Sequence, residues 1–266
     1  MTRHLVLVAG RASHALGEHE FLAGMRLLRA CLADVPDLAV RVVADGDLGD
    51  DVLAVTDALV LFADGGEGHP LLQDDRLAAV TARVGQGMGL GMMHFAVELP
   101  VDRGAAEVTA WIGGTYRDGV SCNPIFEASF TSFPEHPITR GVGPFATRDE
   151  WYFHIELAPD AQPILVTVPS DAVRAGPYVW PHGPYPHIVA ASGRSEVLMW
   201  ARDRPDGGRG FGLSGGHFHA NWGDDDFRRV VLNALVWVSG SDVPVGGVVS
   251  AIGPSDLALE PEVPTP

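Results

Sequence analysis

Two histidines near the end of the chain stand in a setting that favours metal binding or acid–base chemistry. His217 and His219 follow an apolar run and a Ser-Gly-Gly turn, and the acidic residues 224–226 begin a helical pattern just after them. In an extended segment, the i, i+2 spacing would point both imidazoles to one side. A twist at Gly215 and Gly216 would leave only one of them in a cleft. Because neutral imidazole is both a metal ligand and a general base, we predict that at least one of the two is functional.

Other histidines and carboxylates follow the remaining predicted strands. The carboxyl ends of parallel strands meet at one edge of an open α/β sheet, and ligands bind at that edge. The residues expected there, besides the pair just described, are His14, His19, Glu20, Asp64, Glu67, His69, His94 and Glu98. Imidazole combined with carboxylate suits Zn, Mn, Fe or Ni.

The sequence therefore predicts a divalent metal site at this edge. The candidate metal ligands are His19, His94, His217 and His219. The candidate acid/base groups or fourth ligands are Glu20 and Glu98. A histidine taken alone is more often a hydrogen-bonded loop or core residue than a ligand. On that ground His4, His182 and His187 are interpreted as structural, and His136 is expected to hold a turn.

The elements that must position these residues alternate between short apolar runs and helical patterns. Strands are predicted at 4–9, 38–44, 58–62 and 88–93, and helices at 21–32, at 71–84 and from 224 onward. Segments 196–201 and 210–213 are expected to form a hairpin through Asp206 and Gly207. The pattern predicts an α/β fold with a mainly parallel sheet.

A segment rich in proline, glycine and aromatic residues interrupts this alternation at 105–186 and is expected to form long loops and short antiparallel strands over the sheet edge. We take 1–247 as one domain with this insertion as a flap, and 248–266 as a tail. Aromatic residues beside a polar cleft either pack in the core or stack on a sugar ring. The candidate substrate-binding residues are His14, Asp64, Asn123, Trp151, Tyr152, Asn221 and Trp222.

Composition excludes several classes of function. The formal net charge is -16 and the chain contains no lysine. A surface of this sign repels phosphate backbones, so no nucleic-acid partner is expected. The absence of lysine excludes Schiff-base chemistry and a Walker-type phosphate site, and no nucleotide cofactor is predicted. The two cysteines, Cys31 and Cys122, give no disulfide or metal framework. Without a long apolar run or a signal sequence, we expect a cytoplasmic protein with no membrane partner.

Several segments together resemble the ThuA-like family, named for trehalose utilisation, within the class I glutamine amidotransferase-like (flavodoxin-like) superfamily. The resemblance spans 3–247 and rests on SHALGEHEFLAG, FADGGEGHPLL, GLGMMHFAVELP, EHPITRGVGPF with DEWYFH, and GGRGFGLSGGHFHANWGDDDFRRVVLNALVW. It implies a three-layer α/β sandwich. Flavodoxin-like domains often pair, so a homo-oligomer is a further expectation.

The resemblance also bears on the chemistry. Amidotransferases of the superfamily carry cysteine at a sharp turn after a strand, and this position is aligned here with Met93, so glutamine amidotransfer is excluded. Met92 and Met93 are expected to fill the core. Relatives carry histidines around the segment that reads DGVSCNPIF here, where this chain has Gly119 and Ile125. The resemblance therefore implies a narrower ligand set or a different substrate.

Two functions follow from the resemblance. The family is associated with bacterial disaccharide catabolism and with 3-keto sugars made by a partner dehydrogenase. A ketone at C3 acidifies the proton at C2, so a metal and a base would permit elimination, hydrolysis or isomerisation. The first hypothesis is a metal-dependent enzyme acting on a sugar or a 3-keto sugar. The alternative is a non-catalytic sugar-binding or regulatory module on a scaffold that lacks the nucleophilic cysteine.

Overall fold

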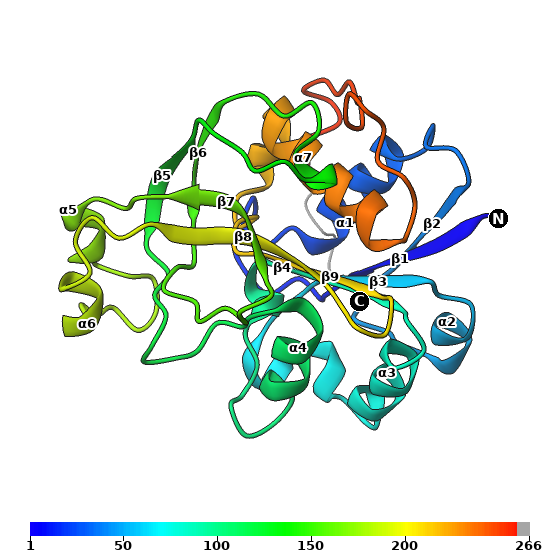
Figure 1. Cartoon of the computed structure of the whole chain (residues 1–266), viewed down its shortest axis with the longest axis horizontal. Helices are drawn as coiled ribbons and strands as arrows, with labels where there is room; N and C mark the ends of the chain where they lie inside the picture. The colour runs from blue at the N-terminus through cyan, green and yellow to red at the C-terminus, as the bar shows by residue number, and fades with distance from the viewer. Residues whose placement is uncertain (260–266) are drawn as a thin grey trace.

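A seven-stranded sheet forms the centre of the computed structural model, which describes residues 1–259 (Figure 1). In spatial order the strands are β2 (Leu38–Val43), β1 (Arg3–Ala9), β3 (Ala58–Phe62), β4 (Gly89–Met93), β9 (Arg209–Leu213), β8 (Glu196–Asp203) and β7 (Gln162–Thr167). The first five run parallel, while β8 and β7 are antiparallel to their neighbours. The mainly parallel sheet expected from the sequence is confirmed.

Helices cover both faces of this sheet, as Figure 1 shows. Leu5 and Leu7 of β1 belong to the core that contains α1 (Phe21–Cys31) and α7 (Asp225–Val238). Val6 and Val8 face the other core, which contains α2 (Asp50–Ala54), α3 (Arg76–Val84) and α4 (Ala105–Ile112). Alternate residues of one apolar strand therefore reach opposite cores, as a strand buried on both faces requires. The result is the three-layer α/β sandwich.

Most of the strands and helices were predicted correctly from local sequence patterns. The hairpin of β8 and β9 pairs Asp203 with Arg209, and Gly207 in its turn has a φ of 85°. Helix α7 begins after Asp224, whose carboxylate accepts the N–H groups of Asp226 and Phe227. An acidic N-cap of this kind satisfies helix donors that have no partner within the helix.

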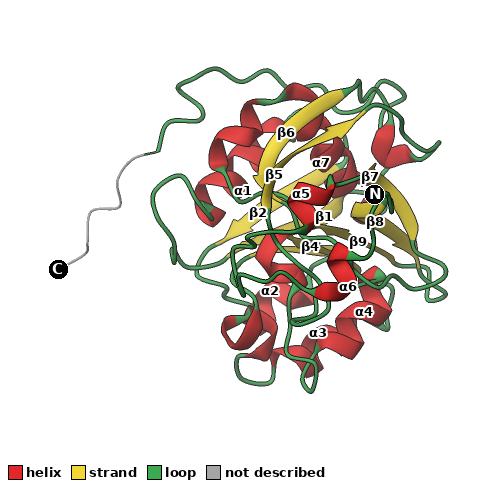
Figure 2. Cartoon of the chain, turned by 90° about the vertical axis from the view of Figure 1, so that its left-hand side faces the viewer, coloured by secondary structure: helices red, strands yellow, loops and turns green. Residues whose placement is uncertain are grey.

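The segment 105–186 is more regular than the sequence suggested. It begins with α4, which lies between left-handed Gly104 and Gly113 and was not predicted. The expected antiparallel strands are present as a separate pair, β5 (Ile125–Phe130) and β6 (Phe145–Glu150), beside the main sheet (Figure 2). Strand β7 joins the main sheet itself. Short helices α5 (Asp171–Arg174) and α6 (Pro186–Val189) follow.

Residues 248–259 pack against α7 and form no helix or strand. Asn233 accepts the N–H of Val248 at 2.8 Å, and Arg228 donates to the hydroxyl of Ser250 at 2.8 Å. Residues 248–259 belong to the predicted tail, and 260–266 lie outside the described residues. Within residues 1–259, no helix combines the length and the hydrophobicity needed to cross a bilayer.

Candidate metal centre

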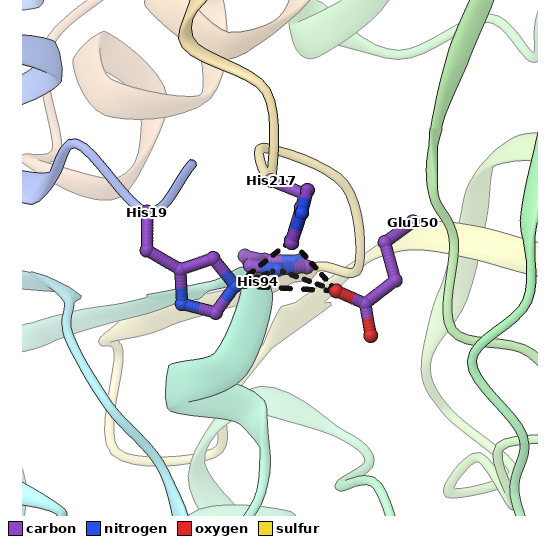
Figure 3. A group of neighbouring side chains, drawn as sticks. All are labelled: His19, His94, Glu150 and His217. Carbon is purple, nitrogen blue, oxygen red and sulfur yellow. Dashed lines mark hydrogen bonds and ion pairs between the residues drawn. The ribbon is translucent and has the colours of Figure 1, made fainter. Parts of the chain in front are cut away.

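Three imidazoles and one carboxylate converge at the carboxyl end of the parallel strands (Figure 3). His19 precedes α1, His94 follows β4, Glu150 ends β6 and His217 follows β9. One atom from each residue lies within 4.8 Å of the others. His19 Nε2 is 2.9 Å from His217 Nδ1 and 3.0 Å from His94 Nε2, and Glu150 Oε2 is 2.7 Å from His217 Nδ1. All four side chains are buried.

Left-handed backbone conformations place two of these histidines. His19 has a φ of 51° and His94 a φ of 52°. Such conformations cost a non-glycine residue about 1–3 kcal/mol, and they cluster at functional sites. The sharp turn after β4 therefore carries His94, not Met93 as aligned from the sequence, because Met93 is the last residue of β4 and is buried against its neighbouring strands.

A buried carboxylate shapes the turn that carries His217. Asp149 accepts the N–H groups of Gly216 at 2.7 Å, His217 at 3.0 Å and Phe218 at 3.3 Å. Gly216 has a φ of 118°, which turns the chain before His217. Of the two alternatives left open by the i, i+2 spacing, the structure selects the twisted one. His217 enters the cluster, and His219 begins a 3-10 turn outside it.

The ring nitrogens that face away from the cluster point toward oxygen atoms. His94 Nδ1 lies 2.8 Å from the carbonyl of Ser214, which only accepts, so Nδ1 carries the proton and Nε2 has a free lone pair. His217 Nε2 lies 3.8 Å from Glu18 and His19 Nδ1 lies 4.0 Å from Asp64. His94 therefore shows the pattern of metal-binding histidines, because its outer acceptor fixes the tautomer that leaves the inner nitrogen free. The separations at His217 and His19 are too long for hydrogen bonds.

Burial and the neighbouring charges shift the pKa values of Glu150 and of the histidines beside it. Burial alone would raise the pKa of Glu150, but the neighbouring imidazoles of His19, His217 and His94 hold it well below its usual value. Burial lowers the pKa of His94. Burial also opposes charge on His19, yet Asp64 and Glu150 leave its pKa above the ordinary value. Within residues 1–259 no arginine forms an ion pair with Glu150, so its charge is balanced only by imidazoles.

A more exposed group lies on the outer side of His19. The hydroxyl of Ser13 donates to Asp64 at 2.8 Å and lies 2.7 Å from His14 Nδ1. The ring of His14 stacks on that of His19 with their centroids 3.6 Å apart. His14 and Asp64, predicted to contact substrate, therefore lie beside the cluster and open to solvent.

Tyr152 and Asn123, also predicted to contact substrate, lie against the cluster. The Tyr152 hydroxyl is 3.4 Å from His94 Nε2, and Asn123 donates to Glu150 Oε1 at 2.9 Å. Glu98 is outside the four-residue cluster, because the turn after β4 is a 3-10 helix that ends at Val97. Burial, together with the charges of Asp118 and Glu150, raises the pKa of Glu98 to about 7.

Two further predicted site residues, Glu20 and Asn221, form hydrogen bonds with backbone groups near the site. Glu20 accepts the N–H of Gly17 at 2.7 Å. Asn221 donates to the carbonyl of Arg148 and lines a pocket of about 400 Å³ together with His219.

Two tryptophans predicted to contact substrate are fully buried. Trp222 stacks on Phe227 at 5.3 Å, and Trp151 packs against Phe227 and donates to the carbonyl of Thr147. The packing interpretation fits both residues.

Four histidines outside the cluster, His69, His136, His182 and His187, have protein partners. His69 accepts the N–H of Leu71 at 3.1 Å and its other nitrogen lies 3.1 Å from the carbonyl of Ala96. Burial lowers its pKa to about 4. His136 accepts the N–H of Ile138 and so holds a turn, as expected. His182 and His187 each lie within hydrogen-bond distance of a backbone carbonyl.

Sequence reasoning missed Glu150, the only carboxylate ligand candidate in the four-residue cluster. The local signal was present. Strand β6 alternates buried and exposed residues until Asp149 and Glu150, which are both buried. Two adjacent carboxylates directly before the aromatic residues Trp151 and Tyr152 break the polar-out pattern of a surface strand. That break marks a polar site.

Comparison with known proteins agrees with this architecture. The profile of the family described as ThuA, trehalose utilisation, matches residues 6–238. The crystal structure of a ThuA-like protein from Bacteroides uniformis ATCC 8492 superposes with a TM-score of 0.60 at 15% identity, covering 91% of this chain and 92% of the other. A ThuA-like protein from Parabacteroides merdae ATCC 43184 gives 0.60 at 17% identity, covering 92% of each chain. No curated protein matches the sequence.

Proposed function

The chain belongs to the ThuA family, described by trehalose utilisation, and from this premise we propose that it is a metal-dependent enzyme acting on a sugar or a 3-keto sugar. A role in trehalose utilisation follows from the family. The metal, the substrate and the reaction are our inference from the site. A ketone of this kind is the product of a sugar dehydrogenase, so we place such an enzyme before it in the reaction sequence.

The geometry of the four-residue cluster is the observation behind this proposal. His19, His94 and His217 direct one ring nitrogen each at a common centre beside Glu150, with ring nitrogens only 2.9 and 3.0 Å apart. A cation between them would accept the lone pairs that now face one another. Ligand nitrogens and oxygens lie about 2.0–2.2 Å from a zinc ion. The cluster therefore needs only a small expansion to bind one. A set of three imidazoles and one carboxylate suits Zn, Mn, Fe or Ni better than Mg or Ca.

The residues beside the cluster supply acid–base chemistry. A bound cation would polarise a sugar carbonyl. Glu98 has a pKa of about 7 and exchanges a proton near neutral pH, as a group that removes the C2 proton must. The Tyr152 hydroxyl, next to His94, keeps its proton because burial raises its pKa, so it is a hydrogen-bond donor for a substrate oxygen. These groups support elimination or isomerisation of a keto sugar.

Cysteine-dependent glutamine hydrolysis has no support at this site. His94 occupies the turn after β4, where the nucleophile of an amidotransferase would stand. The free cysteines, Cys31 and Cys122, lie elsewhere, and burial raises the pKa of both thiols. The lost nucleophile is also what a non-catalytic sugar-binding module would show, so the test below separates these two functions.

The proposal is tested with a 3-keto disaccharide in D₂O, monitored by NMR. We expect the metal-loaded protein to exchange the C2 proton or to cleave the glycosidic C–O bond, and the metal-free protein to do neither. Glu98→Gln should lower kcat, whereas Glu67→Gln, an exposed carboxylate after β3, should not. If sugars raise the melting temperature but no oxidised or unoxidised disaccharide is converted, the binding-module function replaces the enzyme.

A further inference from the structure

The four-residue cluster is closed. His19, His94, Glu150 and His217 would fill all four positions of a tetrahedral cation, and their exposed fractions are between 0% and 5%. Structural zinc sites have four protein ligands, whereas catalytic sites have three and keep a position open for water or substrate. A zinc ion in this cluster could meet a sugar oxygen only by adding a fifth ligand, as catalytic zinc ions do.

An open group of ligands lies directly beside the closed one. One atom each of His14, His19 and Asp64 lies within 4.8 Å of the other two. The ring of His14 is stacked on that of His19, so it must turn before both nitrogens can face one cation at a second centre. Asp64 Oδ1 is 3.8 Å from His14 Nδ1 and 4.0 Å from His19 Nδ1. The side chains of His14 and Asp64 are 34% and 30% exposed. The outer face of this second group is therefore accessible.

The shared histidine points to a ligand at this second centre. His19 is 4% exposed, and its Nδ1 is buried without a hydrogen-bond partner. The distance of 4.0 Å to Asp64 is too long for a hydrogen bond. His94 differs, because its outer nitrogen lies 2.8 Å from a carbonyl. A buried polar atom normally has a partner, so Nδ1 of His19 is available to one further ligand.

We propose that His14, His19 and Asp64 bind a second divalent cation, and that the ring of His19 joins it to the first cation. A neutral imidazole that releases its one ring N–H proton has a lone pair on each nitrogen. One nitrogen would bind each cation, and the released proton passes to solvent, as ligand protons do when metals bind. The second site depends on the proposed function only because the two sites share His19 and the first cation.

The second centre is open to solvent, whereas the first is buried. Three protein ligands leave coordination positions free on the solvent side. Asp64 also lines a pocket of about 470 Å³ between the loops that follow β1, β2 and β3, together with Arg11, Asp45 and Asp47. The strand order reverses at β1 and β3, and open α/β sheets bind ligands at such a point. The ligand class is a polyhydroxylated molecule with two neighbouring oxygens, such as a hydroxy ketone.

Titration of the metal-free protein with Cu(II), followed by equilibrium dialysis and EPR, tests this inference. We expect two equivalents to bind, and the second to reduce the EPR intensity per copper because the shared ring couples the two ions. His14→Ala and Asp64→Asn should each bind one equivalent with an uncoupled spectrum. Asp74→Asn, which removes another carboxylate from the same pocket, should still bind two.

The alternatives give different results. One equivalent in the wild type, with Asp64→Asn changing affinity but not stoichiometry, would mean that Asp64 only orients His19, and would overturn the second site. Two equivalents in both His14→Ala and Asp64→Asn would overturn its placement. No bound copper in the wild type would overturn both centres. Two coupled ions without turnover of any keto sugar would contradict the proposed function while leaving the second site in place.

Discussion

Two buried glutamates at the same edge of the sheet have opposite surroundings. Glu196 begins β8 and is 2% exposed, and Glu150 ends β6 and is 3% exposed. Glu196 lies 2.8 Å from the guanidinium of Arg174, which is fully buried, and accepts the N–H of His154 at 3.1 Å. Glu150 has no guanidinium beside it within residues 1–259 and faces three imidazoles.

The nature of the compensating charge separates a binding site from a structural ion pair. A buried carboxylate is costly unless an opposite charge compensates it. Arg174 compensates Glu196 at every accessible pH, so that pair belongs to the fold. The histidines around Glu150 carry a full charge only when protonated, so a bound cation would compensate Glu150 more completely. The first pair should matter for stability and the second cluster for binding.

The largest effect is expected from Glu196→Gln. It leaves Arg174 buried without its counter-charge, and breaking a buried ion pair in this way costs about 3–5 kcal/mol. Chemical denaturation should show this loss in the free energy of unfolding. Cation binding by the folded variant should remain that of the wild type. A variant as stable as the wild type would remove the contrast between the two glutamates.

Glu150→Gln should affect cation binding more than stability. Removing the anionic ligand should weaken binding of Zn(II) on the order of 100-fold, about 2.7 kcal/mol. The metal-free variant should lose less stability than Glu196→Gln, because the imidazoles that lose their partner can become neutral and Arg174 cannot. Isothermal titration and thermal melts of the metal-free protein measure the two quantities. Unchanged affinity would exclude Glu150 as a ligand.

His69 extends the comparison to a buried histidine whose two ring nitrogens both have hydrogen-bond partners. Its pKa falls from 6.5 in the unfolded chain to about 4 in the fold because of burial. A depressed pKa means that the stability from the neutral ring is present above pH 6.5 and is lost as the pH falls toward 4. Between pH 7 and pH 5 this residue should cost about 2 kcal/mol. The difference in unfolding free energy between wild type and His69→Gln, measured at both pH values, should change by that amount. A constant difference would mean that His69 does not titrate in this way.

The smallest effect is expected from Asp149→Asn. The amide keeps one acceptor oxygen for the turn that carries His217, but it lacks the charge and the second oxygen, so it accepts either from Gly216 or from His217 and Phe218. Outer residues of metal sites contribute tenfold or more to affinity, so we expect Zn(II) to bind about tenfold more weakly. Arg148→Gln changes the neighbouring exposed residue and is the matched control. Equal affinities for the two variants would show that Asp149 does not position the ligand.

Much of this account could be predicted from local sequence. The buried strands, the parallel edge and the turn with His217 follow from apolar runs and their endings, because parallel strands bring their carboxyl ends together. His19 and His94 were predicted as ligands on that ground alone. Helix α4 was missed because the proline-rich and glycine-rich sequence around it hid eight helical residues.

The remaining features depend on long-range packing that spacing does not encode. Glu150 reaches the cluster only because the β5–β6 pair lies over the sheet edge, 67 residues from His217. The choice between His217 and His219 depended on whether Gly216 would adopt a positive φ. Asp149 fixes that conformation from another part of the chain.

The metal content of the purified protein is the decisive test of the four-residue site. The protein should be purified without a nickel column and analysed by mass spectrometry for Zn, Mn, Fe and Ni, with Glu150→Gln and His182→Ala prepared in parallel. We predict at least one equivalent of one of these metals in the wild type and in His182→Ala, little in Glu150→Gln, and a lower wild-type melting temperature after chelation. A metal-free wild type whose melting temperature responds neither to chelator nor to any of the four added metals would contradict the account.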